Sequence, residues 1–129
     1  MSRRNETPLE ESEQTCLFQW AALMANAHPE LRLLHAIPNG GLRSKTEAAR
    51  MKDAGVRRGV PDVFLPVARQ GQHGLYIEMK RRQGGVVSDE QTWWHVNLAK
   101  QGYAVAVCFG WDDARVTLES YLGIENTGR

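Results

Sequence analysis

The pattern of apolar and polar positions divides the chain into eight segments of helical or extended character. Apolar residues at helical spacing predict a first helix over residues 7–27, with Thr7 as its N-cap and Pro8 in its first turn. The apolar run 31–37 predicts a strand, because the turn sequence PNGG follows it directly. The polar segment 44–55 predicts a second helix.

The second half of the chain repeats this alternation with stronger signals. Two apolar runs around the turn RQGQHG predict strands over 62–68 and 75–80. A capped pattern predicts a helix over 88–102, and a last helix is expected over 112–123. The run 103–109 is almost entirely apolar, so we expect a central strand that is covered on both faces.

The order helix, strand, helix, strand, strand, helix, strand, helix indicates an α/β fold. We expect a mixed sheet of about four strands flanked by helices, that is, an α/β/α sandwich. The 129 residues suit one domain over 1–129, since no repeat or long linker divides them. The ends, about 1–6 and 125–129, are expected to be disordered.

Composition is ordinary for a soluble globular protein, with 42% hydrophobic and 24% charged residues. No apolar run approaches the ~18–20 residues of a membrane span, and the N-terminus lacks the apolar core of a secretory signal. Cys16 and Cys108 both lie in apolar segments, so we expect buried thiols and a cytoplasmic, intracellular protein.

The net charge of +1 conceals an uneven distribution. Residues 43–82 contain ten basic and four acidic side chains, whereas the remainder contains six basic and eleven acidic ones. A basic middle in an acidic chain predicts a face for an anionic partner. The alternative is a solvated surface whose charge is merely uneven.

Three side chains suggest chemistry at a metal ion. Glu78 and Lys80 project from the same face of the predicted strand 75–80, while Met79 points to the opposite face. Asp62 begins the preceding strand, and the fifteen residues that separate it from Glu78 suit a strand, a turn and a return. A hairpin would bring the two carboxylates together, where a hard cation such as Mg²⁺ relieves their repulsion. The alternative is a surface ion pair of Glu78 with Lys80 and a turn cap at Asp62.

These residues match a known signature. The pair PD followed by EMK resembles the PD-(D/E)xK motif, and the stretches GVRRGVPDVFLP, GLYIEMKRRQGGVVSDEQTWW and GYAVAVCFGW resemble the VRR-NUC family from about Pro38 to Trp111. The resemblance implies a restriction-endonuclease-like fold and a DNA endonuclease that depends on Mg²⁺ or Mn²⁺. The resemblance is strongest to the stand-alone phage and bacterial members of the family. It therefore also implies selectivity for branched DNA such as Holliday junctions, and a homodimer.

The resemblance assigns a role to each residue of the signature. Asp62 and Glu78 would bind metal, with the backbone carbonyl of Met79 as a further ligand, and Lys80 would be the catalytic lysine. Gln91 matches a glutamine that the family directs at the site from the following helix.

Some of these assignments have structural alternatives. Gln91 also completes a capping box with Ser88, which closes a helix start without any catalytic role. The family uses a glutamate of the first helix, and both Glu10 and Glu13 are candidates. Glu10 fits the spacing better, although it also forms a capping pattern with Thr7.

Basic and aromatic side chains surround the signature. Arginine side chains suit phosphate groups, so we expect DNA contacts from the arginines that bracket the signature and from basic residues at the start of the second helix. The alternative is that these basic side chains form ion pairs with acidic side chains of the protein itself. Trp93 and Trp94 are adjacent on a helix, so one is expected in the core and the other at a dimer contact. The expected DNA-binding residues are Arg57, Arg58, Arg81, Arg82, Arg43 and Lys45.

Two other functions compete with cleavage. A catalytically inactive protein that binds or scaffolds DNA junctions could have the same fold, although the intact Asp62, Glu78 and Lys80 argue against it. The chain lacks G-x-S-x-G, P-loop and G-x-G-x-x-G motifs, which argues against other hydrolases and against a nucleotide cofactor.

Overall fold

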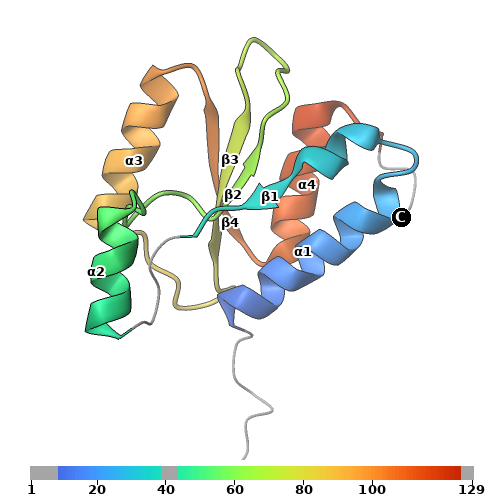
Figure 1. Cartoon of the computed structure of the whole chain (residues 1–129). Coiled ribbons are helices and arrows are strands. Elements are labelled where there is room, and N and C mark those ends of the chain that lie inside the picture. Colours follow the sequence, from blue (N-terminus) through green and yellow to red (C-terminus); the bar gives the residue numbers. More distant parts are fainter. Residues whose placement is uncertain (1–8, 39–43, 126–129) are drawn as a thin grey trace, which may run out of the picture.

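The computed structural model describes residues 9–38 and 44–125. Helical and extended segments follow the predicted order, with one 3₁₀ helix inserted before the first strand (Figure 1). The elements are α1 (Glu10–Met24), the 3₁₀ helix Pro29–Leu33, β1 (His35–Ala36), α2 (Lys45–Asp53), β2 (Val63–Leu65), β3 (Leu75–Lys80), α3 (Asp89–Lys100), β4 (Ala104–Phe109) and α4 (Trp111–Leu122). The expected tail 1–6 and all of the expected tail 125–129 except its first residue lie outside the described residues.

The sheet has four strands in the order β1, β2, β3, β4. The pairs β1–β2 and β2–β3 are antiparallel, whereas β3 and β4 are parallel and joined through α3. Figure 1 shows α1 and α4 on one side of the sheet and α2 and α3 on the other. The structure therefore confirms the predicted α/β/α sandwich with a mixed sheet.

The alternation of β3 separates the core from the polar face. Leu75, Ile77 and Met79 are almost completely buried in a cluster that α1 and α4 complete. Glu78 and Lys80 point from the opposite face, as the period of a strand requires. The core thus fixes the orientation of both polar side chains.

Two predictions near the N-terminus are wrong. The first helix spans Glu10–Met24 after the N-cap residue Leu9, which is shorter than the predicted 7–27, and three acids in its first turn suit the helix dipole. Thr7 and Pro8, expected at its start, lie outside the described residues. The first three residues of the predicted strand 31–37 belong to a 3₁₀ helix, and only His35 and Ala36 form a strand. Its buried residues Leu31 and Leu34 lie three apart, which matches the three-residue turn of such a helix.

The predicted central strand is also wrong in position. β4 lies at the end of the sheet and pairs only with β3 among the described residues. The expected coverage of both faces is present, because α3 packs against one face of β4 and α4 against the other. Cys16, expected to be buried, is exposed on α1, whereas Cys108 is buried in β4.

Neither tryptophan of α3 lies in the core. Trp93 is 60% exposed and Trp94 is half-buried, so the expectation that one of them fills the core is wrong.

Among residues 9–38 and 44–125, no helix is both long and apolar enough to cross a membrane.

Candidate active site

The antiparallel pairing of β2 and β3 brings Asp62 beside Glu78. Val63 pairs with Ile77, so the preceding residue, Asp62, lies across from Glu78 at the end of the hairpin. The Asp62 Oδ2 atom accepts a 2.7 Å hydrogen bond from the backbone N–H of Met79. The two carboxylates therefore converge as the spacing predicted.

Glu78 and Lys80 are deeply buried for charged residues. Their side chains are 1% and 7% exposed, and the Lys80 Nζ atom lies 3.9 Å from Glu78 Oε2. Burial, followed by the charge of Asp62 and a hydrogen bond with it, raises the pKa of Glu78 to about 9. Without a further cation, the site therefore holds one proton between two carboxyl groups at neutral pH.

Gln91 joins the start of α3 to both buried groups. Its Nε2 atom donates a 3.0 Å hydrogen bond to Glu78 Oε2, and its Oε1 atom accepts one of 3.0 Å from Lys80 Nζ. The same Oε1 atom accepts from the backbone N–H of Ser88, whose hydroxyl accepts from the Gln91 N–H. The capping box and the contact with the site are therefore both present.

His95 is a member of the site that the sequence interpretation missed. Its Nε2 atom lies 3.4 Å from Glu78 Oε1, and its side chain is 14% exposed. Burial, followed by the charge of Lys80, lowers the pKa of His95, so the ring is neutral at pH 7. The available signal was its spacing, because a residue four positions after Gln91 lies on the same helix face.

The two glutamates of α1 have different surroundings. Burial raises the pKa of Glu10, and the charges of Lys80 and Asp62 act on it as well, so Glu10 lies at the margin of the site. Glu13 is 3% exposed and accepts hydrogen bonds from the backbone N–H of Trp111 and from the Arg82 guanidinium.

Arg82, an expected DNA contact, takes part in a structural ion-pair network. Its Nε atom lies 2.8 Å from Glu13 Oε2, and its Nη2 atom lies 2.8 Å from Asp112 Oδ1. The Arg82 guanidinium also packs against Gly110, whose backbone φ is +95°. A Cβ added at Gly110 would lie only 2.7 Å from the central guanidinium carbon of Arg82. Arg82 therefore ties α1, the end of β3 and the start of α4 together.

The other expected DNA-binding residues have varied positions. Arg57 and Arg58 are exposed on the segment before Asp62, and Lys45 is exposed at the start of α2. Arg81 is partly buried close enough to Glu10 to lower the pKa of that carboxyl. Arg43 lies outside the described residues.

The donor set fits a hard divalent cation that retains ligands from solvent or substrate. In the described part of the chain, no group of three or more Asp, Glu, His or Cys side chains is gathered tightly enough to hold a metal alone. The convergent pair Asp62 and Glu78 nevertheless offers oxygen ligands, and burial together with the charge of Asp62 raises the pKa of Glu78, an effect that a bound cation would oppose. Magnesium sites commonly use one or two carboxylates together with waters and phosphate oxygens.

Comparison with known proteins shows the family of the chain. The model of the VRR-NUC domain matches residues 4–111. The chain belongs to the VRR-NUC family. A solved structure described as a VRR_NUC domain protein matches with a TM-score of 0.79 and 28% identity over 94% of this chain and 93% of that one. No curated protein matches the chain.

Membership of VRR-NUC fixes the broad class of function. The family is of the nuclease type, which makes this chain a nuclease domain with DNA as its substrate. Asp62, Glu78 and Lys80 lie inside the matched region, as does Gln91.

Proposed function

We propose that the chain is an endonuclease that hydrolyses phosphodiester bonds of branched DNA with the help of Mg²⁺ or Mn²⁺. The observation that supports this most strongly is the convergence of Asp62 and Glu78 beside the buried ammonium of Lys80. A fold alone has no need to bury a carboxyl group and a lysine beside a second, partly buried carboxylate, since isolated buried charges are destabilising.

Asp62 and Glu78 would hold the metal ion, with the Met79 carbonyl and the Glu10 carboxylate as further candidates. When bound, the ion supplies Lewis-acid polarisation of a phosphoryl oxygen and lowers the pKa of a water molecule. Binding requires the ionised form of Glu78, so it displaces the proton that this carboxyl holds at neutral pH.

The remaining residues orient the site and supply charge. The Lys80 ammonium adds positive charge where a phosphate develops negative charge. Gln91 accepts from Lys80 and donates to Glu78, which fixes the positions of both groups. The neutral His95 ring lies 3.4 Å from the other oxygen of Glu78.

Branched DNA and a homodimer belong to the same proposal. A chain of 129 residues offers a small footprint, and a four-way junction has a two-fold axis that a symmetric pair of subunits could match. We also propose an intracellular, cytoplasmic location, in which the unpaired Cys16 and Cys108 remain reduced.

A cleavage panel tests this function. Linear duplex, flap, splayed-arm and four-way junction DNA are incubated with the protein and Mg²⁺ or Mn²⁺, with and without EDTA. We expect metal-dependent cutting, fastest on a branched substrate. Tight junction binding without cutting under either metal would instead favour the inactive junction-binding protein.

A further inference from the structure

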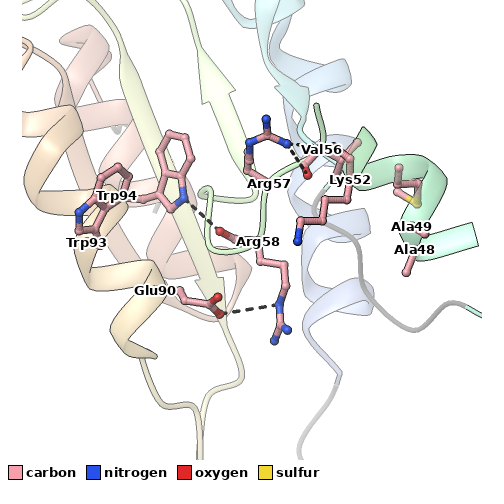
Figure 2. A pocket seen from close by; sticks show the side chains of 10 residues that line it. Ala48, Ala49, Lys52, Val56, Arg57, Arg58, Glu90, Trp93 and Trp94 are labelled. Atoms are coloured by element: carbon pink, nitrogen blue, oxygen red, sulfur yellow. Dashed lines mark hydrogen bonds and ion pairs between the residues drawn. The ribbon is translucent and has the colours of Figure 1, made fainter. Parts of the chain in front are cut away.

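A groove separates α2 from α3 on the side of the sheet that bears Glu78. Its volume is about 790 Å³, which is within the range of ligand-binding pockets. Ala48 and Met51 of α2, Val56 of the following segment, and Trp93 and Trp94 of α3 line it (Figure 2). The groove is therefore mostly apolar, with one aromatic wall.

The aromatic wall presents an indole ring to solvent. Trp93 is 60% exposed, which is unusual for a side chain of its size. Its ring meets that of Trp94 edge to face, with centroids 5.4 Å apart and an interplanar angle of 86°. Trp94 is fixed in turn, because its Nε1 atom donates a 3.0 Å hydrogen bond to the backbone carbonyl of Arg58. A supported, exposed indole suits stacking against a flat ligand.

The charges around the groove favour an anionic ligand. Lys52, Arg57 and Arg58 line it together with a single acid, Glu90, whose Oε1 atom lies 3.7 Å from Arg58 Nε. The Arg57 Nη1 atom donates to the backbone carbonyl of Lys52 at 3.0 Å, which holds the guanidinium beside α2. Three cations against one anion leave an excess of positive charge that phosphates would neutralise.

The same charges disfavour a second copy of this chain as the occupant. A two-fold contact through the groove would bring Lys52, Arg57 and Arg58 of one subunit towards the same residues of the other. Like charges brought together at an interface oppose association.

The groove and the candidate active site share two walls. Along α3, Glu90 lines the groove while its neighbour Gln91 contacts Glu78, and Trp94 lines the groove while His95 contacts Glu78. The segment that carries Arg57 and Arg58 leads directly to Asp62. At Gly59 on this segment, φ is +92° and an added Cβ would lie 2.9 Å from the Glu90 carbonyl carbon, so the segment packs tightly against α3.

We propose that this groove binds an unpaired nucleobase of the DNA substrate, stacked on Trp93, while Lys52, Arg57 and Arg58 hold the flanking phosphates. Stacking on an aromatic side chain tolerates any base, because every base has a flat face. A base inside an intact duplex is not available for such a contact. Resting on the proposed function, the inference adds that the branched substrate presents an unpaired nucleotide close to the cut, for example a base that opens at the branch point of a junction.

A binding experiment with a missing base tests this inference. The Lys80→Ala protein in a Ca²⁺ buffer is titrated into labelled duplexes that carry one bulged nucleotide, one bulged abasic nucleotide or no bulge. We expect the bulged base to bind about 5- to 150-fold more tightly than the abasic bulge, the range that stacking of one base provides. Trp93→Ala should abolish this preference, whereas Trp93→Phe should keep most of it.

Val96→Ala serves as the matched control, since Val96 is an exposed apolar residue of α3 that does not line the groove. Equal binding of the base and abasic bulges, or a preference that persists in Trp93→Ala, would overturn the inference. The inference would also be overturned if Trp93→Ala converts a dimer to a monomer in sedimentation and still prefers the bulged base. The groove would then be a contact between two copies of the chain. Failure of the wild type to cut any DNA, with the base preference present, would overturn only the proposed catalysis.

Discussion

The Gln91 side chain donates a 3.0 Å hydrogen bond to Glu78 and accepts one of 3.0 Å from Lys80. A single amide thus holds a carboxylate and an ammonium that β3 presents from its polar face. Because the same side chain closes the start of α3, the helix cannot shift without disturbing both groups.

This dual role can be separated by mutation. Gln91→Ala removes the amide from Glu78 and Lys80, so turnover should fall about 10- to 100-fold, as for other residues that orient metal ligands. Ser88→Ala is the matched control, because it removes the cap but leaves Gln91 beside the site. It should lower the free energy of unfolding by about 1 kcal/mol with little change in turnover. Equal losses of turnover in the two variants would show that Gln91 acts only through the helix cap.

The raised pKa of Glu78 predicts how stability depends on pH. In the metal-free folded protein this pKa is about 9, above its ordinary value of 4.5, so the folded state retains a proton that the unfolded state has released. The contribution to stability is complete below pH 4.5 and is lost as the pH rises towards 9. Glu78→Gln should therefore flatten the fall in Tm between pH 5 and about 9 and stabilise the metal-free protein at pH 8 by ~1 kcal/mol or more.

Calorimetric melts of both proteins across this pH range, with EDTA present, provide the measurement. The wild type should recover its alkaline stability when Mg²⁺ or Mn²⁺ is added, whereas Glu78→Gln should not. A wild-type Tm that rises from pH 5 to pH 8 without metal would contradict the assignment of the shared proton.

The two glutamates of α1 should respond differently to neutralisation. Glu13→Gln weakens the ion pair with Arg82, so the free energy of unfolding should fall by about 2–3 kcal/mol. This loss is smaller than for a fully buried pair, because the Arg82 side chain is 39% exposed to solvent. Glu10→Gln should leave stability nearly unchanged and weaken Mn²⁺ binding in isothermal titration. If Glu13→Gln weakens Mn²⁺ binding more than Glu10→Gln while remaining folded, the assignment of Glu10 to the site is wrong.

The arginines before Asp62 should contribute to DNA affinity without reading sequence. Replacing Arg57 and Arg58 together with Gln should weaken binding equally for different base compositions. It should also flatten the slope of log K against log salt by about 0.9 for each phosphate that the protein no longer neutralises. Arg32→Gln is a suitable control, because Arg32 is exposed on the 3₁₀ helix outside the basic middle of the chain. An unchanged slope in the double variant would move the DNA face elsewhere, most plausibly to α2.

Much of the polar face could be predicted from the sequence. Strict alternation in β3 places Glu78 and Lys80 on one face, and the fifteen-residue spacing back to Asp62 suits a hairpin that brings both carboxylates to one end. The capping box marks the start of α3, so Gln91 could be assigned to a short distance from Lys80.

Other features depend on tertiary contacts that no local pattern contains. Arg82 looked like a DNA contact because it follows Lys80 in the chain, but its ion-pair partners come from α1 and α4, which are distant in sequence. The apolar run of β4 indicated coverage of both faces correctly, yet hydrophobicity does not reveal whether a strand has one neighbour or two. His95 was missed because a single histidine on a helix is usually structural.

Cleavage by single-site variants tests the central claim most directly. Wild type, Asp62→Asn, Glu78→Gln and Lys80→Ala are compared on a four-way junction with Mg²⁺ and with Mn²⁺, after circular dichroism has established that each variant is folded. We expect the wild type to cut and EDTA to stop it, while each variant loses at least ~100-fold in rate because a metal ligand or the adjacent charge is missing. Turnover close to the wild-type rate by any folded variant of the three would contradict the assignment of Asp62, Glu78 and Lys80 as the catalytic centre.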